Sequence, residues 1–161
     1  MNNRTIKLLF VCTDNIGRSL MAEYLLRNWL ENNNRHDIEV SSCGTNATSD
    51  TSSFCMDHIG KLDEMGIDAS RHKRTQISKE ILARSDIIIA MDESHRDWVR
   101  EKFNKEVMLY NEICKNEKTS IRINPPGSAG PLSNRLLKVF EYIDKSIPDL
   151  VTSIDKIKIN L

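Results

Sequence analysis

Hydrophobic and polar positions alternate along the chain in blocks that predict strands and helices in turn. Residues 6–11 form an almost continuous apolar run, which is typical of a strand buried on both faces. Apolar side chains then recur at helical spacing over residues 19–32. The later blocks predict a strand at 38–42, a helix at 54–65 that ends at Gly66, a short helix at 79–84 capped by Ser78, a strand at 87–90, a polar helix at 94–103 and a strand at 107–110. This order predicts an α/β fold with a parallel sheet and helices on both of its faces.

The C-terminal part of the chain combines a loop with a long helical pattern. Residues 124–131 contain three of the four prolines and predict an irregular surface loop. A closing helix is expected from Ser133 onward, and its apolar positions are Leu136, Phe140, Ile143 and Ile147. The same rhythm resumes after Pro148, so residues 149–161 allow an additional terminal helix. No repeat or linker divides the chain, and we expect residues 1–161 to form a single domain.

Charge and cysteine content exclude several classes of protein. The 161 residues contain 23 Lys and Arg and 23 Asp and Glu, and this balance argues against a nucleic acid or a membrane surface as partner. The apolar stretch at residues 8–12 is too short for a signal sequence or a membrane span. The four cysteines are scattered, and the four histidines show no metal-ligand spacing. We therefore expect a reduced, cytoplasmic protein that uses no metal and no cofactor.

The turn after the first strand is the first place to look for chemistry, because ligands of parallel sheets bind at the carboxyl ends of strands. Cys12 ends the strand, five residues follow, and Arg18 and Ser19 open a helix. So short a loop must curl, and its backbone N–H groups, together with those of the helix start, then form a nest for an anion. The predicted phosphate-binding residues are Thr13, Asp14, Asn15, Ile16, Gly17 and Arg18.

The side chains of this turn are suited to phosphate chemistry. The planar guanidinium of Arg18 can bind two oxygens of a phosphate. The same positive potential favours the thiolate form of Cys12, and the hydroxyl of Ser19 can donate a hydrogen bond to that thiolate. Gly17 is expected to supply the backbone freedom that a tight curl requires.

These residues resemble the low-molecular-weight protein tyrosine phosphatase family, whose members have a strand followed by V-C-x-x-N-x-x-R-S-x-x-A-E. The matching positions are Val11, Cys12, Asn15, Arg18, Ser19, Ala22 and Glu23. Weaker matches follow in the family's order: residues 41–45, residues 66–68 with His72, and residues 85–88 with Met91 and Asp92. The resemblance implies a four-stranded parallel sheet of order 2-1-3-4 and a metal-free hydrolysis in two steps.

The resemblance also implies roles and partners. Cys12 would attack phosphorus and form a cysteinyl-phosphate that water hydrolyses, while Arg18 and the loop amides stabilise the phosphate oxygens. Asn15 would adopt a strained backbone conformation supported by a polar network, for which the matching positions are Ser19, Ser42 and His72. The implied partners are a phosphorylated protein or a small phosphomonoester, with inorganic phosphate or another oxyanion in the loop. We expect a monomer.

One departure from the family pattern concerns the general acid, which in the family is an Asp immediately before a Pro in a late loop. The counterpart here is Asn124, before Pro125, and an amide cannot donate a proton to the leaving oxygen. Activity is therefore low or another group replaces the acid. The candidates for that replacement are Asp50, Asp92, Glu93 and His95, whereas Asp14 could serve only by turning into its own phosphate site.

Three further departures concern the surroundings of the pocket. Residues 46–53 and 126–127 lack the aromatic residues that flank the pocket in eukaryotic members, so phosphotyrosine would have little to stack on. Asp14 places a negative charge beside the anion site and would weaken phosphate binding unless it turns outward. Gly17 stands where many members have a second cysteine that protects the nucleophile. Cys43 could replace it, although a packed residue at a strand end is the simpler interpretation.

Three functions remain open on the sequence. The first is an active phosphomonoesterase, with phosphotyrosine as the expected substrate. The second is a weakly active or inactive phosphate-binding module, which is suggested by Asn124. The third is a thiol-linked arsenate reductase. That chemistry needs further cysteines after the third strand, and residues 91–110 contain none.

Overall fold

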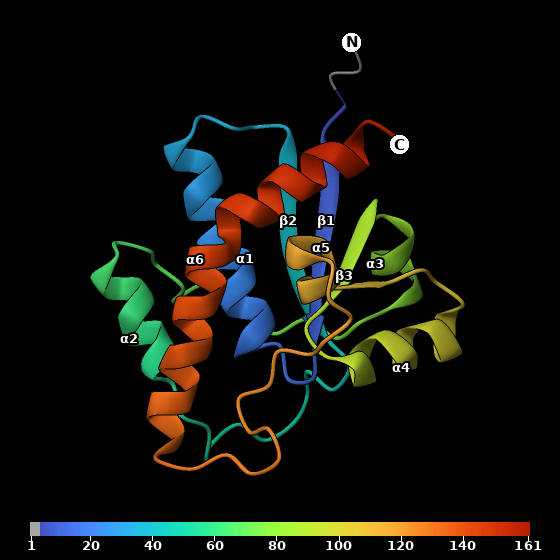
Figure 1. Cartoon of the computed structure of the whole chain (residues 1–161). Helices are drawn as coiled ribbons and strands as arrows, with labels where there is room; N and C mark the ends of the chain where they lie inside the picture. The colour runs from blue at the N-terminus through green and yellow to red at the C-terminus, as the bar shows by residue number, and fades with distance from the viewer. Residues whose placement is uncertain (1–3) are drawn as a thin grey trace.

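A four-stranded parallel sheet forms the centre of the protein (Figure 1), for which a computed structural model describes residues 4–161. Its strands are β1 (Ile6–Cys12), β2 (Ile38–Gly44), β3 (Ile87–Ala90) and β4 (Met108–Leu109). They lie in the order β2-β1-β3-β4, which confirms the predicted order 2-1-3-4. The central strand β1 pairs with β2 over all seven of its residues, from Ile6 opposite Ile38 to Cys12 opposite Gly44. The carboxyl end of β1 is therefore held on the β2 side up to its last residue.

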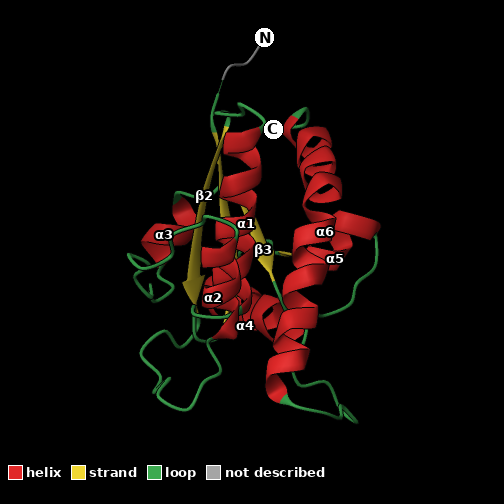
Figure 2. Cartoon of the chain, turned by 90° about the vertical axis from the view of Figure 1, so that its left-hand side faces the viewer, coloured by secondary structure: helices red, strands yellow, loops and turns green. Residues whose placement is uncertain are grey.

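Helices cover both faces of the sheet, as predicted (Figure 2). They are α1 (Arg18–Asn32), α2 (Asp57–Glu64), α3 (Lys79–Ala83), α4 (Glu93–Phe103), α5 (Tyr110–Lys115) and α6 (Leu132–Lys158). Buried residues of α1, α2, α5 and α6 form one core with Leu8, Phe10 and Cys12 of β1. Buried residues of α3 and α4 form a second core with Leu9 and Val11. Successive residues of β1 thus point to opposite cores, which explains the continuous apolar run in this strand.

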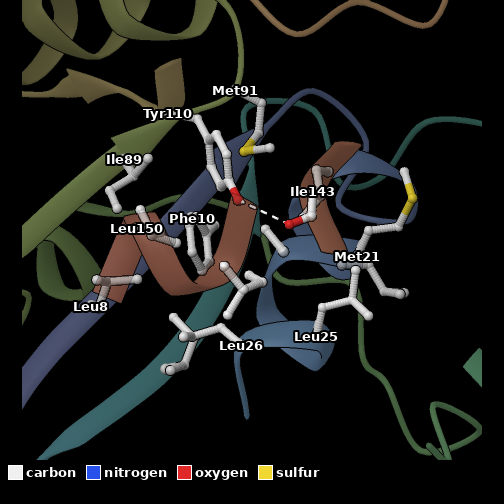
Figure 3. Packing of buried hydrophobic residues seen from close by; sticks show 14 of the residues in the cluster. Leu8, Phe10, Met21, Leu25, Leu26, Ile89, Met91, Tyr110, Ile143 and Leu150 are labelled. Carbon is white, nitrogen blue, oxygen red and sulfur yellow. Dashed lines mark hydrogen bonds between the residues drawn. The ribbon is translucent and has the colours of Figure 1, made fainter. Parts of the chain in front are cut away.

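The larger core fixes the helix that follows the candidate loop. Phe10 of β1 packs among Met21, Leu25 and Leu26 of α1, and Tyr110 and Ile143 close the cluster from the other side (Figure 3). The hydroxyl of Tyr110 lies 2.7 Å from Ser146 Oγ in α6, so the only polar atom of this ring is satisfied. Because β1 and α1 both pack in this core, the positions of the two ends of the turn between them are fixed.

Several element boundaries differ from the prediction. The helix expected at 54–65 begins only at Asp57, and residues 54–56 stay outside it. The strand expected at 107–110 is reduced to Met108–Leu109, because Tyr110 already begins α5, a helix that the sequence pattern did not indicate. None of the helices within residues 4–161 combines the length and the hydrophobicity needed to cross a membrane.

Residues 149–158 are helical, but they continue α6 through Pro148 as far as Lys158 and form no separate terminal helix. A proline inside a helix removes one backbone hydrogen bond and disturbs the preceding turn. Here Ile147, Leu150 and Ile154, on both sides of the proline, are buried in the same core. Their burial on one continuous helical face outweighs the local cost of the proline.

Candidate active site

The loop between β1 and α1 is shaped by the end of β2. The N–H groups of Thr45 and Asn46 donate to the carbonyl oxygens of Cys12 and Thr13, at 2.9 and 2.8 Å. Gly44 lies so close to the loop that a Cβ atom in its place would be 2.5 Å from the carbonyl oxygen of Thr13. The loop therefore rests directly on the backbone of β2, and only glycine fits at this contact.

Asn15 is the centre of the buried polar network behind the loop. Its φ is +55°, in the left-handed region, and its side chain is fully buried. The side-chain amide donates to Ser19 Oγ at 3.0 Å and to Ser42 Oγ at 2.8 Å, and its oxygen accepts from the N–H of Thr75 at 2.8 Å. Gly17, which we expected to allow the curl, has a φ of −109°. The left-handed position is Asn15 instead, since asparagine tolerates this conformation and its amide is bonded on all sides.

Three successive carbonyl groups of the loop point outward to basic side chains. The carbonyl oxygen of Asp14 accepts from Arg74 Nε at 2.9 Å, that of Asn15 from His72 Nε2 at 2.8 Å, and that of Ile16 from His58 Nε2 at 2.6 Å. Carbonyl groups held in this way direct the neighbouring N–H groups to the inner side of the curl. We expected a supporting position only for His72. Nothing in the sequence pattern singles out Arg74 or His58 for this role.

The thiol of Cys12 is buried at the bottom of the curl, with an exposed fraction of 3%. Its sulfur lies 2.8 Å from Ser19 Oγ. Because Asn15 already donates to that hydroxyl oxygen, the hydroxyl hydrogen of Ser19 is free to point at the sulfur. Ser42 in turn donates to the buried carboxylate of Glu23 at 2.8 Å. Glu23 was recognised as a motif position only, and the structure makes it the far end of this network.

The carboxylate of Asp14 is engaged beside the loop. It accepts a hydrogen bond from Ser49 Oγ, while Arg74 donates to the same hydroxyl at 2.7 Å and to the carbonyl oxygen of Ser49 at 2.8 Å. The guanidinium of Arg74 therefore offsets part of the negative charge that we expected to weaken phosphate binding. Asp14 still lines the cavity described below.

Arg18 and Arg122 share one carboxylate. Arg18 Nη1 donates to the carbonyl oxygen of Ile121 at 2.8 Å and lies 3.7 Å from Asp92 Oδ2. The same Asp92 oxygen accepts from Arg122 Nε at 2.9 Å, and its other oxygen caps α4 through the N–H of Ser94. Burial alone would raise the pKa of Asp92, but the bonds from Ser94 and Arg122 outweigh it and lower that pKa to about 2. Asp92 is thus a carboxylate at neutral pH and has no proton to give.

His95 supports the loop from the α4 side. Its Nε2 lies 2.8 Å from Thr13 Oγ1, and the ring is buried. Burial and the positive charge of Arg18 lower the pKa of His95 to about 4, so the ring is neutral at pH 7. A neutral ring makes a poor proton donor, and His95 is not among the residues that line the cavity.

A cavity of about 500 Å³ opens above Cys12. Its lining brings together residues that are far apart in the sequence: Cys12, Asp14, Ile16, Gly17, Arg18, Ser53, Phe54, Cys55, His58, Asp92, Arg122, Ile123, Asn124, Leu132 and Leu136. Asn124 from the proline-rich loop therefore reaches the same cavity as Cys12. Of the four candidates for a replacement acid, Asp92 alone contributes to this lining.

The pocket has one aromatic side chain that the sequence pattern did not predict, although residues 126–127 contribute none, as expected. The stretch 46–53 contains no aromatic residue, but Phe54 follows immediately and lines the cavity. Its exposed fraction is 37%, which leaves the ring available to a bound molecule. Because α2 begins only at Asp57, residues 53–55 run as irregular chain past the cavity.

Cys43 lies on the other side of the sheet from Cys12. It packs in the second core with Leu9 and Val11, whereas Cys12 belongs to the first. Burial, and after it the nearby Cys12, raise the pKa of the Cys43 thiol well above its usual value. This favours the packed-residue interpretation. The second cysteine that lines the cavity is Cys55.

A cysteine beneath a curled loop, with an arginine at the start of the following helix, defines a cysteine-based phosphatase. The family described as low molecular weight phosphotyrosine protein phosphatase matches residues 7–159. The chain belongs to this family, as its motifs suggested, and it is an enzyme of the phosphatase class.

Individual relatives agree with this assignment. The chain is 28% identical to a protein-arginine-phosphatase of Geobacillus stearothermophilus over 151 residues, which cover 94% of this chain and 93% of that protein. It is 30% identical to the low molecular weight protein-tyrosine-phosphatase Ptp of Acinetobacter johnsonii over 94 residues, 58% of this chain and 62% of that protein. The crystal structure of the low molecular weight protein tyrosine phosphatase from T. tengcongensis superposes with a TM-score of 0.74 at 27% identity. That match covers 92% of this chain and 99% of the other.

Proposed function

We propose that this enzyme is a protein tyrosine phosphatase that works through a cysteinyl-phosphate on Cys12. The observation that carries the proposal is the contact of 2.8 Å between Cys12 Sγ and the Ser19 hydroxyl at the bottom of a cavity that Arg18 also lines. A hydroxyl hydrogen bond lowers the energy of a thiolate both before it attacks and when it leaves.

The reaction has two displacements at phosphorus. In the first, the Cys12 thiolate forms an S–P bond, and the electron pair of the broken P–O bond stays on the leaving oxygen. The loop N–H groups and Arg18 hold the three remaining phosphate oxygens. In the second, water attacks phosphorus and gives up a proton to solvent, which balances the proton that the leaving oxygen takes up from solvent. The S–P bond breaks, and its electrons return to the sulfur. Inorganic phosphate is released, and Ser19 stabilises the regenerated thiolate.

The apolar lining supports an aromatic substrate. Ile16, Phe54 and Leu132 all line the cavity that contains Cys12. A phenyl ring bound between such side chains removes apolar surface from water and can stack on Phe54. Phosphoserine offers no comparable group.

Phosphoarginine is the second candidate substrate. The Geobacillus relative with that activity in its name matches almost the whole chain. In addition, the carboxylates of Asp14 and Asp92 line the cavity and would attract a guanidinium leaving group. Asp92 already faces two arginines, Arg18 and Arg122, and this weakens its attraction for a guanidinium leaving group. Phosphotyrosine is therefore the preferred candidate substrate.

Asn124 sets the expected limit on the rate. It lines the cavity where the family would place a proton donor, and its amide cannot protonate the leaving oxygen. The rate should therefore fall steeply as the pKa of the leaving group rises. If the missing proton donor slows hydrolysis so much that turnover nearly stops, the protein would act as a phosphate-binding module.

We also propose that residues 1–161 form a single catalytic domain and that the enzyme works as a monomer. All of the residues that line the cavity come from the single segment 12–136. The described cysteines are free thiols, which is in keeping with a reducing compartment such as the cytoplasm.

A kinetic comparison tests the proposal. Three peptides of one sequence would carry phosphotyrosine, phosphoarginine or phosphoserine, and phosphate release would be followed in the burst and the steady state. We expect the highest kcat/KM for phosphotyrosine. A preference for phosphoarginine would select the second candidate, and a stoichiometric burst without steady turnover would select the binding module.

The Cys12→Ser variant provides the matched control for the nucleophile. It should lose turnover while keeping its affinity for phosphate or vanadate within a modest factor, because the loop and Arg18 remain. Hydrolysis by this variant at near the wild-type rate would refute the assignment of Cys12.

A further inference from the structure

A second cavity, of about 590 Å³, lies beside the catalytic one. Its walls come from α5, from the segment 119–129 and from α6. Arg122 and Ile123 line both cavities. The two cavities are therefore neighbours that meet at these two residues.

The lining of the second cavity has an excess of positive charge. It contains the side chains of Lys115, Arg122, Arg135 and Lys138 and no Asp or Glu. The chain as a whole is neutral, so this excess is local. A cavity lined by one sign of charge attracts groups of the opposite sign.

Two of these four cations have no acidic partner in the described part of the chain. Lys115 lies 3.1 Å from Glu117, and Arg122 lies 2.9 Å from Asp92. Among residues 4–161, neither Arg135 nor Lys138 has a carboxylate within 4.0 Å. Arg135 donates one bond, to Ser128 Oγ at 3.1 Å, and its Nε has no partner in the described part of the chain.

Three neutral polar side chains of the cavity, in contrast, are already paired with one another, and Ser120 Oγ accepts from the N–H of Glu93 at 2.8 Å. Tyr142 donates its hydroxyl hydrogen to Asn111 Oδ1, and Asn111 Nδ2 donates to Thr119 Oγ1 at 2.9 Å. Arg135 and Lys138 are three residues apart on α6 and therefore project to the same side of the helix. Among the polar side chains of the lining, those left to bind a ligand are therefore cationic.

We propose that this second cavity binds an acidic segment of the phosphorylated protein substrate, with Asp or Glu side chains paired to Arg135 and Lys138. The inference rests on the proposed function, because it takes the phosphorylated residue to be bound above Cys12. The substrate chain would then pass Arg122 and Ile123, and carboxylates a few residues away would enter the second cavity. Substrate choice would depend on acidic flanking residues as well as on the phosphorylated one.

A charge-matched pair of variants tests this assignment. The double variant Arg135→Gln with Lys138→Gln removes the two unpaired cations. The control, Lys145→Gln with Lys156→Gln, removes two exposed cations of the same helix that do not line the cavity. Each protein would be assayed with phosphotyrosine peptides that carry Asp and Glu, or Asn and Gln, at positions two to five on either side.

We expect acidic flanks to lower the KM of the wild-type enzyme by about three- to tenfold at low ionic strength, since partly exposed ion pairs have modest energies. This advantage should disappear in the Arg135/Lys138 variant, persist in the Lys145/Lys156 control and fade as salt is added. Hydrolysis of a small aryl phosphate should be equal in all three proteins. Equal KM values for acidic and neutral peptides in the wild type, or an unchanged preference in the first variant, would overturn the proposal.

A binding measurement separates the failure of this inference from the failure of the proposed function. The anisotropy of a fluorescent acidic peptide without phosphate would be titrated with each protein. Binding that is lost only in the Arg135/Lys138 variant supports the cavity even if phosphotyrosine proves to be the wrong substrate. Binding that is identical in all three proteins refutes it, whatever the enzyme hydrolyses.

Discussion

Asp92 holds together the two arginines beside the catalytic cavity, and Asp92→Asn isolates the contribution of its charge. Asparagine keeps the shape of the side chain and an oxygen that can still accept the N–H of Ser94. The substitution removes the negative charge that faces Arg122 at 2.9 Å and Arg18 at 3.7 Å. The change in stability therefore reports the charge and leaves the helix cap in place.

The magnitude follows from the pKa of Asp92, which is lowered from 3.8 to about 2 in the folded protein. This lowering of the pKa corresponds to about 2 kcal/mol of stability at neutral pH, and the small exposed fraction of the Asp92 side chain limits screening by solvent. Because the folded-state pKa is depressed, this contribution is fully present above pH 3.8. It is lost as the pH falls through about 2.

Urea unfolding of the wild type and the variant at several pH values measures this contribution. The difference in unfolding free energy should be about 2 kcal/mol at pH 7 and roughly half of that at pH 3. Asp97→Asn is the matched control on the same helix, since Asp97 is 62% exposed in its ion pair with Arg96 and should matter much less. A difference for Asp92→Asn that is the same at pH 7 and pH 3 would refute the reasoning.

Three other substitutions probe the catalytic cavity. Asn124→Asp should raise the rate on aryl phosphates with poor leaving groups by up to about 10²-fold, with little effect on good ones. A slope of log rate against leaving-group pKa that does not flatten would show that this loop does not supply the proton. Gly44→Ala places a Cβ atom 2.5 Å from the carbonyl oxygen of Thr13, so it should cost about 1–3 kcal/mol in thermal or urea unfolding and reduce kcat/KM. Wild-type stability would mean that the loop does not rest on β2. Phe54→Ala should raise the KM of aryl phosphates by about two- to tenfold while leaving inorganic phosphate inhibition unchanged, and equal KM values would remove Phe54 from the binding site.

Features that depend on neighbouring residues were predictable from the sequence. The apolar run of β1, the spacing between Cys12 and Arg18 and the amphipathic start of α1 lie within about thirty residues, and together they predict a buried strand, an anion-binding turn and a helix. The alternation of strands and helices predicts a parallel sheet, since parallel neighbours require crossover connections. The resemblance to a known family supplied the strand order and the position of His72 behind the loop.

The composition of the cavity was decided by tertiary structure. Phe54, His58, Arg74 and Arg122 follow no local pattern that separates them from other surface residues, yet three of them line the cavity and Arg74 supports the loop. Tertiary structure also decides that α6 continues through Pro148. The burial of side chains on both sides of the proline outweighs its tendency to interrupt a helix. A chain segment specifies its own conformation through short-range contacts. Which side chains meet around Cys12 depends on how separate segments pack on one sheet, and that information is spread over the whole chain.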